Sequence, residues 1–263
     1  MINDGLAPNT IHNYFTQLNK TLRYGLRHRL IWHNPAQGVE LPKNERSEGF
    51  EPVFLDMRQL NALLLHLEDD KPFDTLVQFA ALTGLRAAEI AGLRIRDVDL
   101  TDGHIEVRQT YKKIDGVWTF GTPKSARSVR DVPVLHKGLL LALKTHKLAH
   151  PYSGNPDALF WPGRHPKTHV LDYDRPANTT SILRHTIRPA ATAAQLPATI
   201  RFHDLRHTYA SMMLAAGFKP FQVSRWMGHA SVNTTDTVYG HLYPVDYTEQ
   251  TAQFERFAAL TAN

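Results

Sequence analysis

The sequence contains no cysteine, so a disulfide framework and a thiolate metal site are both excluded. It also has no run of about 18 apolar residues, the length that a membrane-spanning helix needs. The first ten residues, MINDGLAPNT, carry neither the basic nor the apolar segment of a secretion signal. We therefore expect a cytoplasmic protein that has no membrane partner.

Acidic residues are slightly outnumbered, with 25 Asp and Glu against 30 Lys and Arg, which gives a formal net charge of +5. A basic excess favours a polyanionic partner such as nucleic acid, although an excess this small is weak evidence alone. A length of 263 residues suits one large domain or two small ones.

Residues 10–29 predict an amphipathic helix with Asn9 as its N-cap, because apolar residues recur there at helical spacing. Lys20, Arg23 and Arg27 fall on the opposite face of that helix. A basic stripe of this kind either binds DNA phosphates or forms an ordinary solvated face, and the sequence does not decide between the two.

Residues 41–49 carry Pro, Gly and charged side chains with hardly any apolar residue, which predicts an interdomain linker. It separates a first unit, residues 1–44, from a second, residues 50–263. Within the second unit, Asp56 is placed to cap an amphipathic helix, and a further helix is expected to end at Gly84.

Residues 104–134 change to a strand pattern, with an Asp115-Gly116 turn between two alternating apolar runs. We expect a three-stranded antiparallel sheet there, with Lys124 near its second turn. Gly116 and Gly121 have the spacing of a phosphate-binding P-loop, but that motif has Lys directly after its second Gly and opens a helix. No nucleotide cofactor is therefore expected.

The leucine-rich stretch 136–149 predicts a helix, and residues 163–178 predict a long loop. A helix that begins near Asn178 carries Arg184 and Arg188, which face either DNA or solvent. The chain is therefore predicted to be mixed α/β and mainly α-helical.

Residues 201–239 carry four side chains that handle phosphate well, His203, Arg206, His229 and Tyr239. His203 and Arg206 stand three apart on a predicted helix, so both face one side and can converge on an anion. Taken singly, each residue is more often a solvated or packed side chain. His203 and His207 lack the Glu of a HExxH zinc site, so we expect no metal there.

Three segments in this region, HDLRHTYAS, MGHAS and TTDTVYGHL, resemble the C-terminal signature of the tyrosine recombinases, the phage integrase family. Over a hundred residues earlier, TGLRAAEIAGL is similar to the first catalytic arginine motif of that family, and TPKSARSVRDVPV to its catalytic hairpin. The segment HRLIWHNPAQGVELPKN resembles the end of the core-binding domain that clamps DNA in relatives. Residues 1–44 would then be part of such a helical (SAM-like) domain.

The resemblance implies a catalytic set in which Tyr239 attacks a DNA phosphate and the other residues stabilise charge or move protons. That set is Arg86, Lys124, His203, Arg206, His229 and Tyr239. Glu89 and His207 are the supporting residues, and no cofactor is implied. The predicted last helix, with Phe254, Phe257 and Leu260, resembles a tail that joins subunits into a tetramer on DNA.

The function implied is site-specific recombination of double-stranded DNA through a 3′-phosphotyrosine, in the integration or excision of a mobile element. Two alternatives remain. One is strand cutting and resealing like that of a type IB topoisomerase, and the other is a DNA-binding module that no longer recombines.

Overall fold

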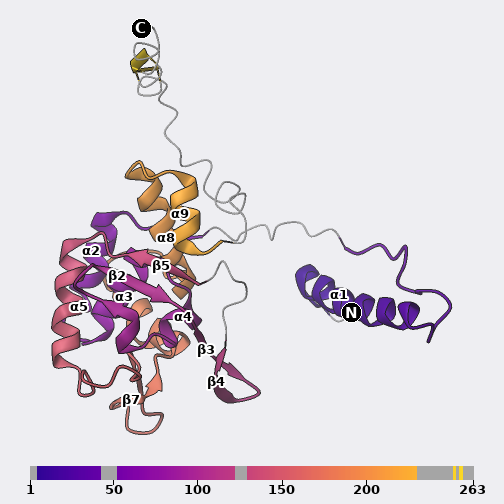
Figure 1. The fold of residues 1–263 in the computed structure, drawn as a ribbon, viewed down its shortest axis with the longest axis horizontal. Helices are drawn as coiled ribbons and strands as arrows, with labels where there is room; N and C mark the ends of the chain where they lie inside the picture. The colour runs from indigo at the N-terminus through magenta and orange to yellow at the C-terminus, as the bar shows by residue number, and fades with distance from the viewer. Residues whose placement is uncertain (1–4, 43–51, 122–128, 230–250, 253–254, 257–263) are drawn as a thin grey trace. The chain divides into compact units, whose positions relative to one another are not determined.

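The computed structural model describes residues 5–42, 52–121, 129–229, 251–252 and 255–256. It divides the chain into two compact units, Met1–Glu51 and Pro52–Asn263 (Figure 1). No helix in the described ranges has both the length and the apolar character needed to cross a membrane. Most of the predicted linker, residues 41–49, lies outside these ranges, as does most of the predicted last helix.

The described residues of the first unit, 5–42, contain one helix, α1 (Pro8–Arg27), which confirms the predicted amphipathic helix. The predicted cap was wrong, because Ala7 is the N-cap residue and no side chain caps the helix. Pro8 takes the first helical position, where its fixed φ suits the helix and its missing N–H has no helical partner to lose.

The apolar face of α1 is largely exposed. Within residues 5–42 only Ile11 and Ala36 are buried, while Tyr14 and Leu18 are 55% and 52% exposed. The helical period of the sequence therefore identified the helix correctly, but this unit buries little of the stripe that the period predicts.

The second unit begins with two helices whose ends follow the predicted signals. In α2 (Met57–Leu65), the Asp56 side chain accepts a hydrogen bond from the Gln59 N–H at 2.8 Å, and the Gln59 side chain accepts one from the Asp56 N–H. Helix α3 (Phe73–Thr83) ends at Gly84, whose φ of 64° is left-handed and suits glycine.

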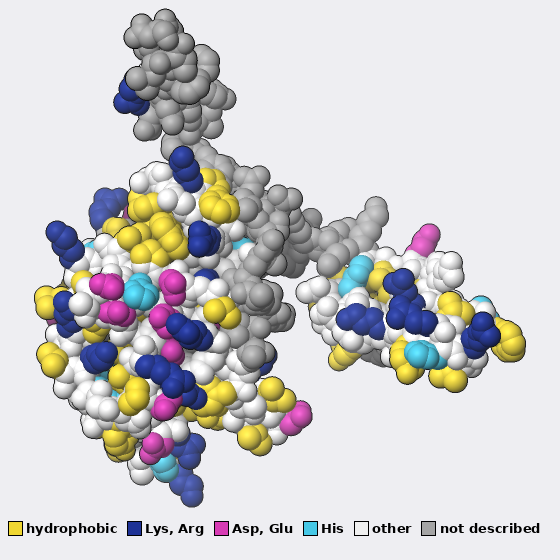
Figure 2. Space-filling view, in the orientation of Figure 1, with side chains coloured by type: hydrophobic (Ala, Val, Ile, Leu, Met, Phe, Trp, Pro, Cys, Tyr) yellow, Lys and Arg dark blue, Asp and Glu magenta, His cyan; other side chains and the backbone are white. Residues whose placement is uncertain are grey.

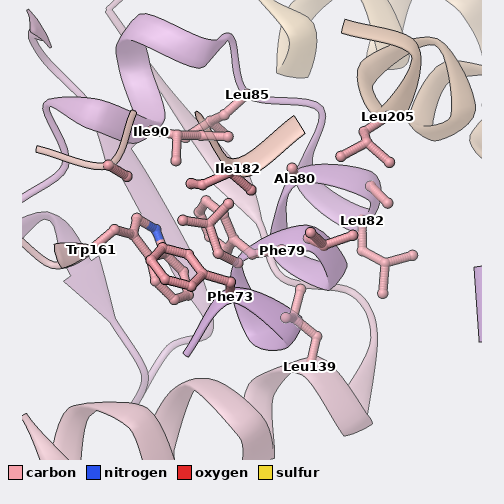
Figure 3. Packing of buried hydrophobic residues seen from close by; sticks show 14 of the residues in the cluster. Phe73, Phe79, Ala80, Leu82, Leu85, Ile90, Leu139, Trp161, Ile182 and Leu205 are labelled. Carbon is pink, nitrogen blue, oxygen red and sulfur yellow. The ribbon is translucent and has the colours of Figure 1, made fainter. Parts of the chain in front are cut away.

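Helix α3 is the centre of the hydrophobic core, since nine of its eleven residues are buried. It packs against α5 (Lys137–Ala149) and α8 (Phe202–Ala215). In Figure 3 its Phe79 ring lies beside Trp161, with the ring centroids 5.3 Å apart. Three shorter helical segments lie close to α3 or α8 in the sequence. Helix α4 (Ala87–Ala91) and a 3-10 turn (Ile95–Asp97) follow α3, and α9 (Pro220–Met227) follows α8.

The strands between residues 98 and 133 form two sheets where one had been predicted. Strands β1 (Val98–Asp99), β2 (His104–Val107) and β5 (Arg130–Pro133) make a three-stranded antiparallel sheet in the order β1-β2-β5. Strands β3 (Thr110–Ile114) and β4 (Val117–Gly121) form a separate two-stranded sheet, with no further strand beside them among the described residues. The antiparallel class was right, but the assignment of strands to the sheet was wrong.

The hairpin leaves the sheet because β3 packs against α4. The Gln109 side chain donates to the Gly92 carbonyl oxygen at 2.8 Å, and a Cβ on Gly92 would lie 2.9 Å from the Tyr111 nitrogen. The predicted turn is confirmed, with Ile114 paired to Val117 and positive φ values at the two residues between them, as a two-residue hairpin loop requires.

The predicted long loop at residues 163–178 was wrong, because β6 (Pro162–Arg164) and β7 (Leu171–Pro176) form a hairpin. A Cβ on Gly163 would lie 2.6 Å from the Pro176 carbonyl oxygen, so the two strands approach closely at a glycine. Pro162 and Gly163 in β6 and Pro176 in β7 had hidden the alternating pattern on which strand prediction depends.

The predicted helix after Asn178 is confirmed, and the Asn178 side-chain oxygen caps it by accepting from two backbone N–H groups. It is continuous but irregular, with α6 (Thr179–Ile182), a π-helical turn (Leu183–Ile187) and α7 (Arg188–Ala193).

We predict that Phe79→Ala lowers the free energy of unfolding by about 3–5 kcal/mol, because it leaves a cavity beside Trp161 in the core. Leu148→Ala is the matched control, since Leu148 is 86% exposed on α5 and should change stability by less than about 0.5 kcal/mol. Urea unfolding of both variants measures the difference. Equal losses would contradict the placement of the core around α3.

Candidate active site

Helix α8 carries three of the predicted site residues, and its first turn is fixed by an arginine and an aspartate. The Arg201 N–H donates to Asp204 Oδ2 at 2.8 Å, and Arg201 Nη2 donates to Asp204 Oδ1 at 2.8 Å. The Asp204 side chain is 1% exposed. This carboxylate therefore caps the helix.

Arg206 lies one turn further along α8 and is buried, with an exposed fraction of 3%. Its Nη1 donates to the Gly84 carbonyl oxygen at 2.5 Å and its Nη2 to the Met227 carbonyl oxygen at 2.8 Å. These carbonyls stand at the C-terminal ends of α3 and α9, where helix dipoles attract a cation. A Cβ on Gly84 would meet the Tyr209 ring at 2.4 Å, so glycine also admits this packing.

Arg86 is the residue from which α4 begins, and its predicted pair with Glu89 is present. The Arg86 N–H donates to Glu89 Oε2 at 2.8 Å, and Arg86 Nη1 donates to Glu89 Oε1 at 2.9 Å. Arg86 Nη2 donates to the Gly228 carbonyl oxygen at 2.7 Å. The Glu89 side chain is 1% exposed and that of Arg86 37%, so this is a partly buried interaction and not the surface ion pair that spacing alone would suggest.

Arg130 binds the same carboxylate from strand β5. Its Nη1 and Nη2 donate to the two Glu89 oxygens at 3.0 and 2.9 Å, and its Nε donates to the Trp226 carbonyl oxygen. Burial alone would raise the pKa of Glu89, but hydrogen bonds and charge from Arg130 and Arg86 outweigh it and lower that pKa below its ordinary value. Glu89 is therefore an anion at neutral pH.

Three guanidinium groups thus meet at the C-terminal end of α9. The carbonyls of Trp226, Met227 and Gly228 accept from Arg130, Arg206 and Arg86 respectively. These carbonyls have no partner inside the helix, so the arginines replace water there. Gly228 ends the helix with a φ of 64° and places His229 next to the cluster.

The histidines near these arginines are held neutral. Burial, then Arg206 and Arg86, lower the pKa of His229 to about 3. Burial and the neighbouring His203 lower the pKa of His207 to about 4. The rings of His203 and His207 meet edge to face with centroids 4.9 Å apart.

The pKa of His203 itself is lowered by partial burial and by the charges of Arg206 and Arg201. In the unprotonated form an imidazole has one acceptor and one donor nitrogen, so each of these rings can accept one hydrogen bond and donate another. With several guanidinium groups nearby, the site suits an anion whose negative charge increases during a reaction.

The structure brings together Arg86, Glu89, His203, Arg206, His207 and His229 from the predicted set. Lys124 and Tyr239 lie outside the described residues. Arg184 and Arg188 are exposed on the helix that follows β7. Lys20, Arg23 and Arg27 are exposed on α1, in the other unit, where Figure 2 shows Lys and Arg side chains gathered on one face.

Sequence reasoning missed Arg130. A signal was present in the sequence, because Arg130 alternates with Val132 and Val134, and the structure buries Arg130 and Val132 while Asp131 between them is exposed. An arginine at an inward position of an alternating strand needs a buried partner of opposite charge.

Two groups of side chains could hold a metal ion among the residues that the structure describes. Both lie along the β1-β2-β5 sheet and share His104, one with Asp99 and Asp102 and the other with Glu106 and Asp131. Neither includes His203 or His207.

Residues 53–245 match the model of the phage integrase family. Among curated proteins, the chain is 29% identical over 247 residues to the ICEBs1 integrase of Bacillus subtilis (strain 168), covering 93% of this chain and 64% of that protein. It is 28% identical to the prophage integrase IntR of Escherichia coli (strain K12), covering 90% of this chain and 58% of that protein. The chain therefore spans about three fifths of the length of these relatives.

Among solved structures, the fold resembles the Tn1549 transposon integrase in complex with circular intermediate DNA, with a TM-score of 0.71 and 21% identity. That match covers 98% of this chain and 82% of the transposon protein. The XerA recombinase matches with a TM-score of 0.53 over 99% of this chain and 85% of its own. The predicted fold class is confirmed by these likenesses. Because the family model matches well over half of its residues, the chain belongs to the phage integrase family.

Proposed function

We propose that this chain is the catalytic part of a site-specific DNA recombinase that cleaves and rejoins DNA through Tyr239. The observation that carries the proposal is the convergence of Arg86 and Arg206 with His229 at the end of α9. Carbonyl bonds fix both guanidinium planes before a ligand arrives, and such preorganisation is what stabilises a charged transition state.

In the proposed reaction the Tyr239 hydroxyl oxygen attacks the scissile phosphorus, and His203 accepts the phenolic proton. Arg86 and Arg206 stabilise the charge on the non-bridging oxygens, to which His229 also donates a hydrogen bond. The bond from phosphorus to the 5′ oxygen breaks, and Lys124 supplies the proton for that oxygen. The products are a 3′-phosphotyrosine and a free 5′ hydroxyl, so rejoining needs no nucleotide cofactor.

The proposed partner is double-stranded DNA at a specific site. Lys20, Arg23 and Arg27 are exposed along one face of α1, as a phosphate-binding stripe requires, and the relatives named above include a transposon integrase in complex with DNA. We also propose that residues 1–44 are part of a core-binding domain and that subunits assemble into a tetramer through the segment with Phe254, Phe257 and Leu260.

A suicide DNA substrate, nicked beside the scissile phosphate, should become covalently attached to the wild-type chain and not to Tyr239→Phe. The phenolic oxygen is the atom that forms the bond, and phenylalanine lacks it. Denaturing gels measure the attachment, with Tyr243→Phe as the matched control. Attachment that persists in Tyr239→Phe and vanishes in Tyr243→Phe would assign the nucleophile to Tyr243.

Relaxation of plasmids that lack any target site would favour the topoisomerase-like alternative. Specific binding without any covalent product in the wild type would favour a DNA-binding module.

Arg86→Lys and Arg206→Lys should each slow single-turnover cleavage by about 10²-fold, because lysine keeps the charge but loses the planar fork that matches a phosphate. DNA affinity should change by less than about threefold. Arg164→Lys is the control, since Arg164 pairs with Asp70 at a partly exposed site distant in sequence from both motifs. An equal loss in the control, or a loss confined to affinity, would remove the two arginines from the transition state.

The rate of cleavage at subsaturating DNA should fall with decreasing pH only below about 6.5, the ordinary pKa of histidine. The pKa of His203 is lowered in the folded chain, so its base form predominates at pH 6.5 and is lost as the pH falls through that lower value. His203→Gln should cleave slowly and lack this acid limb. An acid limb centred above pH 7, or one unchanged in His203→Gln, would show that His203 is not the base.

A further inference from the structure

Arg130 is a charged residue that the proposed reaction does not use, although it lies in the middle of the site. Its side chain is 4% exposed. A buried charge destabilises a protein unless it is paired and hydrogen-bonded, and apolar side chains of similar volume often serve packing equally well. The contacts of Arg130 therefore indicate what a guanidinium does there that an apolar residue would not.

These contacts join three segments that are distant in the sequence. From β5, the guanidinium binds both Glu89 oxygens on α4 and, through Nε, the Trp226 carbonyl oxygen near the end of α9. The two parallel bonds to the carboxylate fix orientation as well as distance. A Cβ on Gly228 would lie 2.9 Å from Arg130 Nη1, so α9 ends directly against this side chain.

Both ends of this linkage lead to proposed catalytic groups. Glu89 holds the Arg86 backbone N–H and the Arg86 Nη1, so the place of the first catalytic arginine depends on that carboxylate. Trp226 precedes His229 by three residues, and Gly228 offers its carbonyl to Arg86. Arg130 thus contacts the carboxylate that holds Arg86 and, through the Trp226 carbonyl, the helix end that precedes His229.

We propose that Arg130 is a positioning residue that sets the distance between Arg86 and His229 by bridging Glu89 to the end of α9. The effect of Arg130 on cleavage rests on the proposed function, whereas its effect on the position of His229 rests on the geometry alone. Arg130 needs no contact with DNA for this role. Lysine cannot replace it, because one ammonium group cannot reproduce two parallel bonds to a carboxylate together with a third bond to a carbonyl.

The first measurement uses the full chain without DNA. Histidine ring nitrogen signals, with His229 assigned by its loss in His229→Gln, are followed by NMR from pH 7.5 to 5 in the wild type, Arg130→Lys and Arg94→Lys. Arg94 is the control because it also bridges distant segments, by pairing with Asp157 at 2.7 Å. The wild-type ring and the control should not titrate in this window. In Arg130→Lys the ring should begin to titrate, because a displaced α9 end exposes it to water.

The second measurement is single-turnover cleavage of the suicide substrate. Arg130→Lys should cleave about 10- to 100-fold more slowly, with a dissociation constant for DNA within about threefold of the wild type, because misplaced catalytic groups slow chemistry more than binding. Glu89→Gln disrupts the same pair of Arg130–Glu89 hydrogen bonds from the acceptor side, because glutamine has the shape of glutamate but lacks its charge and one of its acceptor oxygens. The double variant should be no more than about threefold slower than the slower single variant.

The outcomes separate this inference from the proposed function. No covalent product in the wild type would reject the proposed function, and the NMR arm would still test the positioning role. A folded Arg130→Lys with an unchanged His229 ring and wild-type cleavage would overturn the inference. Multiplicative losses in the double variant would also overturn it, because they would make Arg130 and Glu89 independent. Should Arg130→Lys fail to fold, Glu89→Gln carries both measurements.

Discussion

The site depends on the hydrogen bonds that three arginines donate to the last carbonyls of α9. A helix end leaves such carbonyls without partners, and here the partners come from α4, β5 and α8. The same hydrogen bonds give the helix carbonyls their partners and fix the orientation of the guanidinium groups. One buried carboxylate, Glu89, balances part of the charge and links Arg86 to Arg130. The histidines next to this cluster stay neutral because they are themselves largely buried, and at His229 the positive charge of Arg206 and Arg86 lowers the pKa further.

Local signals in the sequence were enough to predict much of this arrangement. Gly84 and Gly228 mark helix ends by their left-handed backbone, and the spacing of Arg86 and Glu89 places them on one side of a short helix. Such features depend on residues within one or two turns of each other. For the same reason, helices α2, α3, α5 and α8 begin and end close to where their caps and apolar periods predict.

Contacts between distant segments could not be predicted in this way. The pair formed by Arg130 and Glu89 spans 41 positions, and no periodicity within either segment specifies its partner. The same holds for β2, which pairs with β5 across the whole β3-β4 hairpin because β3 is drawn onto α4 at Gly92. Helix α1 shows the opposite situation. The spacing of its apolar residues clearly predicts a helix, but whether that apolar face is buried depends on contacts outside the helix.

The sequence separations within the cluster bear on how such a chain is made. Arg86 reaches a carbonyl 142 positions later, Arg206 one that is 122 positions earlier, and Arg130 one that is 96 positions later. Contacts this distant form late in folding, because closing long loops costs entropy before the contacts compensate for it. A chain emerging from the ribosome therefore holds separate arginines and no assembled cluster until α9 has been synthesised and docked. A product of translation that ends before α9 would therefore lack the carbonyls that orient the three arginines, and with them the arrangement on which the proposed cleavage of DNA depends.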